Sequence, residues 1–276
     1  MTGLAPLDAI GLADDAEIAV DAAAMLLAAE DRPGLGAERA LELLPDAAPV
    51  LLAAELAARD AGHAAPAPCD WAQAVARLVA HDLGIRGDRE TYDAPENADL
   101  IAVLGRGRGL PVAIAILAVG LVRRAGGKAH VIGLPGHAIA QVGDGADAVW
   151  LDLFHGPDLL DAGGIGQALA RALGRLVRLS VADLRPLSNR QALVRLVSNQ
   201  LVRARKAGDI ARARVLAERL VRVAPQAAEL WWELARLEQL ANDRAAARRA
   251  LAAMRETTRD PAWLRRIAAA AETLAR

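Results

Sequence analysis

A chain of 276 residues is long enough for one large domain or two modest ones, and 54% hydrophobic residues provide ample material for a core. Only 3% of the residues are aromatic, so Ala, Leu, Val and Ile must build that core, a composition that favours helices. The single cysteine, Cys69, excludes an internal disulfide and a thiolate metal cluster, in agreement with a reducing compartment. Because no long uncharged apolar run or signal-like start occurs, we expect a soluble, cytoplasmic protein without membrane contact.

The net charge of −1 conceals an uneven distribution of charge along the chain. Residues 186–276 carry 18 basic and 9 acidic side chains, a balance of +9, whereas the remainder carries 15 and 25, a balance of −10. The basic part is therefore expected to attract the acidic part or to meet an acidic partner. The alternative is that arginine only fills exposed helix faces.

Helical patterns dominate the first third of the chain and predict a helical cover. Apolar residues recur with helical spacing in three segments, 15–30, 37–44 and 47–60. We expect Asp70 to cap a further helix over about 71–83, which Gly84 ends. In the same way, Asn97 is expected to cap a short helix over 98–104.

The middle of the chain has the pattern of a helix packed on a sheet. Pro111 is suited to a first helical position, where the N–H that proline lacks has no partner in any case. The residues that follow, 112–124, are apolar almost all round, which is typical of a buried central helix. Short β-branched or alternating runs then predict three antiparallel strands, over 129–134, 138–142 and 148–154. The fold class is therefore predicted to be α+β.

The last third of the chain returns to helical patterns and contains an internal repeat. A helix is expected over 165–176, and a linker over 180–188. Beyond the linker, residues 208–221 align with residues 242–255 at an offset of 34, the period of tetratricopeptide repeats. We therefore predict an α+β domain over 1–185 and an all-α, tetratricopeptide-like domain over 186–276, closed by a helix over 262–275.

Two polar residues after the central helix suggest the remains of a catalytic triad. His137 and Asp152 lie on successive predicted strands, an order that suits a base and its orienting acid. A cysteine nucleophile would gain most from the start of the central helix, but Pro111 and Val112 occupy that place. Residues 92–179 contain no Ser, Thr or Cys. The base and the acid therefore have nothing nearby in the sequence to activate.

Two catalytic alternatives stay open beside a structural role for these side chains. Cys69 precedes the helix predicted at 71 and is a candidate thiol nucleophile, although a buried inert thiol is the alternative. Residues His130, His137, Asp152 and His155 are of zinc-ligand type and stand on neighbouring predicted strands, although no short ligand pair occurs. A hydrogen-bonded structural histidine is the competing interpretation of His137.

Taken together, these motifs resemble the SirB1 family of the transglutaminase-like superfamily. The resemblance rests on Tyr92 with Pro95 and Asn97, Arg-Gly-Leu-Pro-Val at 108–112, Pro-Gly-His at 135–137, Leu-Asp-Leu-Phe-His-Gly at 151–156 and Ser-Asn-Gln-Leu at 198–201. In active members of the superfamily a cysteine begins the central helix, and a histidine and an aspartate follow on strands. The resemblance implies that Pro111 or Val112 replaces the cysteine, as SirB1-like proteins generally lack it, and that His137 and Asp152 are vestigial.

The resemblance implies a non-catalytic regulatory or protein-binding role, and we expect a protein partner. The residues expected to line its binding cleft are Asn97, Arg108, Gly109, Pro135, Gly136, His137, Asp152 and His155. No cofactor or metal is expected, and the few aromatic residues among the arginines do not favour nucleic acid. The alternative is an enzyme, either a thiol hydrolase or acyltransferase that uses Cys69, or a metal hydrolase that uses His137, Asp152 and His155.

Overall fold

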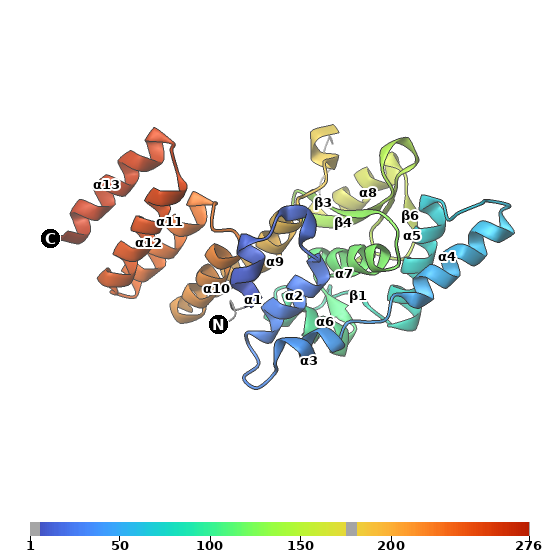
Figure 1. The fold of residues 1–276 in the computed structure, drawn as a ribbon, viewed down its shortest axis with the longest axis horizontal. Helices are drawn as coiled ribbons and strands as arrows, with labels where there is room; N and C mark the ends of the chain where they lie inside the picture. Colours follow the sequence, from blue (N-terminus) through green and yellow to red (C-terminus); the bar gives the residue numbers. More distant parts are fainter. Residues whose placement is uncertain (1–5, 175–180, 276) are drawn as a thin grey trace. The chain divides into compact units, whose positions relative to one another are not determined.

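The structure is a computed structural model that describes residues 6–174 and 181–275 (Figure 1). The chain divides into two compact units, one made of residues 14–193 and the other of residues 1–13 together with 194–276. None of the described helices combines the length and the apolar composition needed to cross a membrane. The two units are described separately below.

The first helix, α1 (Pro6–Leu12), belongs to the C-terminal unit, whereas the sequence pattern assigned it to the N-terminal domain. Packing against helix α10 (Ile210–Val223) explains the difference, because Leu7 is fully buried and Asp8 pairs with Arg222 at 2.7 Å. Contacts between residues more than 200 positions apart leave no periodic signal in the sequence. The boundary between these two compact units falls inside helix α9 (Asn189–Lys206), at 193/194, and a domain boundary at 185/186 stays a prediction.

The helical cover of the larger unit agrees with the sequence pattern, although two caps differ. Its helices are α2 (Val20–Ala29), α3 (Ala37–Glu42), α4 (Ala48–Asp60), α5 (Pro68–Arg77) and α6 (Leu100–Arg106). Helix α5 begins three residues earlier than predicted, so Asp70 lies inside its first turn and accepts the N–H of Ala67 at 2.8 Å. A π-helical turn over Leu78–Asp82 continues α5. The prediction that Asn97 caps α6 is wrong, because Asp99 does so by accepting the N–H of Ala102.

Helix α7 (Pro111–Arg124) is the centre of this unit, and every residue from Pro111 to Val122 is buried. It packs on strands β3 and β4 of a four-stranded antiparallel sheet with the order β3-β4-β5-β6 (Figure 1). The strands are β3 (Ala129–Leu134), β4 (His137–Val142), β5 (Val149–Leu151) and β6 (Leu159–Leu160). The α+β prediction is confirmed. The three predicted strands occur as β3, β4 and β5, but β5 ends at Leu151, three residues before the predicted end. The sequence did not predict strand β6, because its two leucines are too few to show the alternation that indicates a strand.

The sheet is covered on a second side by helix α8 (Ala162–Leu173). Side chains of the sheet and the helix form one apolar cluster, made of Ile132, Leu134, Ile139, Ile165 and Leu169. This cover explains why all six residues of β4 are buried. The helix predicted over 165–176 begins three residues earlier, at Ala162, and residues 175 and 176 lie outside the described residues.

The segment predicted as a linker over 180–188 is packed against the sheet in its described part. Residues 181–184 form a 3₁₀ turn, and residue 180 lies outside the described residues. Pro186 then forms a β-bridge with Ile132, and the N–H of Leu187 donates to the carbonyl of Val131 at 2.8 Å. Residues 186 and 187 therefore pair with the outer side of strand β3, where the sequence had predicted only a linker.

The C-terminal unit repeats one local structure at the spacing seen in the sequence. Its helices after α1 are α9 (Asn189–Lys206), α10, α11 (Ala228–Leu240), α12 (Arg244–Thr257) and α13 (Pro261–Ala275). Asp209 caps α10 and Asp243 caps α12, each by accepting the N–H three residues on. The residues just before these caps, Gly208 and Asn242, both have positive φ, 72° and 60°. Helices α10 and α12 therefore begin in the same way, 34 residues apart, and each is 14 residues long.

Candidate functional site

The start of helix α7 lies at the end of the sheet that carries His137. At the opposite end, Arg123 donates from Nε to the carbonyl of Ala129 at 2.7 Å, so the last turn of α7 adjoins the start of β3. The 14 residues of α7 span about 21 Å and the six of β3 about 20 Å, and the two run in opposite directions. Pro111 therefore lies near the far end of the hairpin, where Leu134 pairs with His137.

Three titratable side chains meet at this end of the sheet. The Nε2 atom of His137 lies 2.9 Å from Oδ2 of Asp152, and Nδ1 of His155 lies 2.5 Å from the same oxygen. The three ligand-type atoms all lie within 4.8 Å of one another. Asp152 follows β5 and its carbonyl accepts the N–H groups of His155 and Gly156, so a tight turn returns His155 to the carboxylate. His137 and Asp152 are buried, and 12% of the His155 side chain is exposed.

The carboxylate of Asp152 is the charged centre of this cluster. Burial raises the pKa of the Asp152 carboxyl, but contacts with the imidazoles of His137 and His155 outweigh burial and hold that pKa well below its usual range. Nδ1 of His155 forms a hydrogen bond with the Asp152 carboxylate. Nε2 of His137 lies within ion-pair distance of the same carboxylate, but the contact does not have hydrogen-bond geometry. The second oxygen, Oδ1, is buried and accepts no hydrogen bond from the described residues. An ionised carboxylate with one unused oxygen is thus enclosed in the protein.

Aromatic rings enclose the cluster on one side. The ring of Phe154 lies 5.9 Å from that of His137, 5.1 Å from that of His155 and 5.9 Å from that of Tyr92. A side chain at Gly87 would lie 2.4 Å from the carbonyl oxygen of Phe154, so only glycine permits this approach. Tyr92, which is 37% exposed, forms the outer edge of the aromatic group.

The loop that presents Tyr92 is fixed by a polar network. The carboxylate of Asp88 accepts the hydroxyl of Thr91 at 2.6 Å and the N–H of Thr91 at 2.8 Å. Buried Asn97 donates to the carbonyl of Thr91 at 2.7 Å and accepts from Arg106 at 3.2 Å. Sequence reasoning missed Asp88, Thr91 and Arg106, although the Asp-x-x-Thr spacing is a signal for such a local turn. This network explains the burial of Asn97 better than a cap does.

Replacing Asp88 with asparagine should destabilise the protein in a pH-dependent way. The hydroxyl and N–H of Thr91 lower the pKa of Asp88 to about 2, below the value of about 3.9 in an unfolded chain. A lowered pKa stabilises the folded state above about pH 4, and this contribution is lost as the pH falls toward 2. We expect Asp88→Asn to cost about 1.5 kcal/mol at pH 7, less than the full linkage value, because the amide oxygen of asparagine can still accept one of the hydrogen bonds of Thr91.

Urea unfolding followed by circular dichroism at pH 7 and pH 3 measures this difference. The matched control is Asp82→Asn, because Asp82 is exposed and lies outside the network. An equal loss of stability in both variants, or a loss for Asp88→Asn that does not shrink at pH 3, would show that Asp88 has no such role.

The other residues expected in the binding cleft lie around the cluster rather than in it. Arg108 pairs with Glu90 at 2.8 Å. Gly109 is buried, and a Cβ atom added to it would lie 2.8 Å from the side chain of Val103. Pro135 and Gly136 form the exposed turn between β3 and β4. These residues fix the backbone beside the cluster, and their role in binding stays a prediction.

Two candidates from the sequence lie at the other end of the sheet. His130 pairs with Asp144 at 2.8 Å and stands opposite Gln141, roughly 13 Å along the strand from His137. Pro68, the neighbour of Cys69, packs on Gly143, where a Cβ atom would lie 2.6 Å from its ring. Gly143 follows His137 by six residues of extended chain, or roughly 20 Å. Cys69 is therefore far outside hydrogen-bond reach of His137, and His130 does not belong to the cluster.

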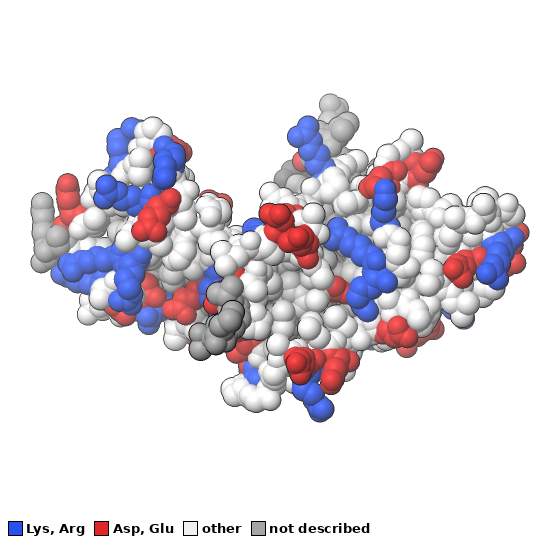
Figure 2. Space-filling model, in the orientation of Figure 1, with Lys and Arg blue, Asp and Glu red and all other residues white. Residues whose placement is uncertain are grey.

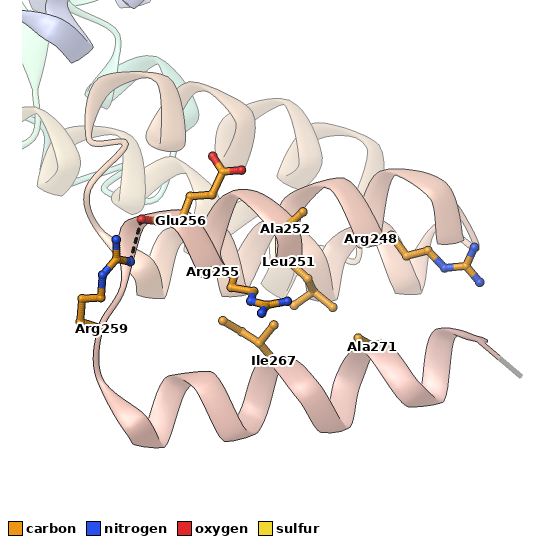
Figure 3. A pocket seen from close by; sticks show the side chains of 8 residues that line it. All are labelled: Arg248, Leu251, Ala252, Arg255, Glu256, Arg259, Ile267 and Ala271. Atoms are coloured by element: carbon orange, nitrogen blue, oxygen red, sulfur yellow. Dashed lines mark hydrogen bonds between the residues drawn. The ribbon is translucent and has the colours of Figure 1, made fainter.

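The C-terminal unit contains a groove of about 610 Å³ between helices α12 and α13 (Figure 3). Its lining residues are Arg248, Leu251, Ala252, Arg255, Glu256, Arg259, Ile267 and Ala271. Leu251 and Ile267 are buried and form an apolar floor, and Arg255 extends beside them into the space between the helices. Figure 2 shows arginines gathered over these helices, with fewer acidic side chains among them. The groove is thus apolar at its floor and basic at its rim.

Sequence comparison assigns the chain to a superfamily. Residues 50–198, more than half of the chain, match the model of the transglutaminase-like superfamily, and the chain belongs to that superfamily. UPF0162 proteins from two strains of Xylella fastidiosa, 9a5c and Temecula1 / ATCC 700964, are 30% and 29% identical to it over 129 residues. Each alignment covers 46% of this chain and 46% of the relative. The matched part of the chain thus spans about half the length of these relatives.

One solved structure with overall similarity is the crystal structure of menin, which reveals the binding site for the Mixed Lineage Leukemia (MLL) protein. The similarity covers 90% of this chain and 68% of that chain, with a TM-score of 0.43 and 14% sequence identity.

Proposed function

We propose that the protein is a non-catalytic, SirB1-like member of its superfamily that acts as a protein-interaction or regulatory module. The observation that supports this proposal is that Pro111 and Val112 begin the buried helix α7, at the position where the resemblance to the superfamily implies a nucleophile. Neither side chain has a nucleophilic atom, while His137 and Asp152 remain buried, 2.9 Å apart, at the same end of the sheet. Without a nucleophile at the start of this helix, the buried base and its acid have nothing there to activate for acyl transfer.

The position of Cys69 supports the same conclusion. A thiol hydrolase or acyltransferase needs its sulfur within about 3 Å of the base or one water away. Cys69 lies beside Pro68 at the end of β4 remote from His137, and its Sγ atom is 3.8 Å from Oδ1 of Asp70. Peptidase or acyl-transfer activity that Cys69→Ser abolishes would contradict the proposal.

The C-terminal helices supply the surface that we propose for a partner. The matching caps of α10 and α12, 34 residues apart, favour a tetratricopeptide-like pair of helix hairpins, a structure that exposes helix faces for binding. The groove between α12 and α13 has three arginines and one glutamate around an apolar floor. An amphipathic acidic peptide segment matches both its charge and its floor.

Reversing the charge of the groove should weaken binding of such a peptide. We expect the full chain to bind a fluorescein-labelled peptide with leucine and glutamate on one helix face, measured by fluorescence anisotropy. The double variant Arg255→Glu, Arg259→Glu should raise the dissociation constant about tenfold, because the new glutamates on the rim would repel the acidic peptide. The control is Arg265→Glu on the exposed side of α13, which does not line the groove and should leave affinity unchanged.

The outcome decides between a specific groove and general attraction to basic helices. Equal weakening by Arg265→Glu would mean that the peptide responds only to net charge. Absence of saturable binding to the unaltered chain would remove the groove as the partner surface.

A further inference from the structure

We infer that His137, Asp152 and His155 form a binding site for a single divalent transition-metal ion of the Zn²⁺ type. Two imidazole nitrogens and one carboxylate are the donors such ions prefer, whereas Ca²⁺ and Mg²⁺ prefer oxygen ligands alone. The three donor atoms lie within 4.8 Å of one another. This inference does not rest on the proposed interaction role, and it reverses the sequence-based expectation that no metal is bound.

The spacing of the donors is close to that of a zinc site. Ligand atoms at 2.0–2.2 Å from a tetrahedral zinc ion lie roughly 3.3 Å from one another. The nitrogens of His137 and His155 are now 2.9 and 2.5 Å from the same oxygen of Asp152. Side-chain shifts of about 1 Å or less would therefore open the cluster around an ion, without movement of the strands.

Asp152 has an acceptor that the protein itself does not use. Its Oδ1 atom is buried and accepts no hydrogen bond from the described residues. A buried polar oxygen without a donor is costly, since burial removes the water that would otherwise solvate it. A cation held by the carboxylate and the two imidazoles would give this carboxylate the partner that it lacks.

The surroundings hold the ligands in place and leave one approach. The ring of Phe154 contacts both imidazoles, and Arg89 reaches the carbonyl of His155 at 3.4 Å, which supports the turn. Supporting contacts of this kind orient metal ligands. Because the protein provides three ligands, a fourth position remains for water or for a side chain of a partner. The partly exposed His155 marks the side from which an ion enters.

Metal titration of the full chain tests this site. After treatment with a chelator and dialysis, we expect Zn²⁺ to bind at one ion per chain by isothermal titration calorimetry. Co²⁺ should give the intense visible absorption of four-coordinate cobalt. His155→Ala should weaken Zn²⁺ binding about 100-fold, since it removes a ligand from a three-residue site. His130→Ala is the matched control, because His130 lies on the neighbouring strand with Asp144 and should leave the affinity unchanged.

His155→Gln, which keeps the size of the side chain, serves as a second variant, and thermal unfolding shows that each variant is folded. No saturable Zn²⁺ binding by the unaltered chain would overturn the inference. Binding that His155→Ala and His155→Gln leave intact, or that His130→Ala weakens equally, would assign the metal to surface histidines instead. None of these results bears on peptide binding at the C-terminal groove, so the two proposals fail separately.

Discussion

Replacing Asp152 with asparagine should lower the free energy of unfolding by about 3 kcal/mol at pH 7, although the two side chains have nearly the same shape. The carboxylate contacts both His137 and His155, and removal of one partner from a buried charged group leaves the others uncompensated. Urea unfolding followed by circular dichroism measures the loss. The magnitude reflects the burial of the group, because an exposed pair of this kind contributes less than about 1 kcal/mol.

The pH dependence of the loss identifies its electrostatic origin. The pKa of Asp152 is lower in the folded chain than in an unfolded one, so the carboxylate stabilises the fold above about pH 4 and less as the pH falls. The difference between the unaltered chain and Asp152→Asn should therefore shrink at pH 3. Asp147→Asn, at an exposed position just before β5, is the control and should change stability by less than about 0.5 kcal/mol. A pH-independent loss would indicate a packing defect instead.

The parts of the fold that local patterns specify were predictable from the sequence. Pro111 and the apolar residues after it predict α7, and the turns at Pro135-Gly136 and at 143–145 predict the hairpin and the next strand. Each of these signals depends on residues within one helix or one turn. For the same reason the 34-residue repeat predicted the matching starts of α10 and α12.

The candidate site was predictable only in part, because its geometry depends on a turn that was assigned to a strand. His137 and Asp152 were identified from their order in the chain. A strand over 148–154 that continued to His155 would place residues 152 and 155 on opposite faces, since side chains alternate along a strand. The chain instead turns at Asp152, and His155 lies beside the carboxylate.

Contacts between distant segments were outside the reach of pattern analysis. Asp15 accepts the N–H groups of Asn189 and Arg190 at 2.9 Å and so supports the start of α9 from more than 170 residues away. Burial raises the pKa of Asp15, but these backbone hydrogen bonds outweigh it and lower the pKa. Nothing in either segment alone signals the contact. Such pairings require the fold before they can be inferred.

A buried aspartate also explains a glycine in the middle of the central helix. Asp21 of α2 is 1% exposed, and its carboxylate pairs with Arg124 at 3.0 Å. A Cβ atom at Gly120, one turn before Arg124, would lie 2.0 Å from the Cγ atom of Asp21. Glycine normally weakens a helix by about 1 kcal/mol relative to alanine. Here its missing side chain provides the space through which the ion pair forms.

Gly120→Ala should therefore lower the free energy of unfolding by about 3 kcal/mol, because the new methyl group displaces the buried carboxylate and disrupts its pair with Arg124. The same substitution at Gly105, an exposed position of helix α6 with no atom within 4 Å of the added Cβ, should instead raise stability by about 0.5–1 kcal/mol. Urea unfolding of both variants measures the two changes, which have opposite signs. A stabilising effect at both glycines would mean that Asp21 has room to move and that the ion pair does not require Gly120.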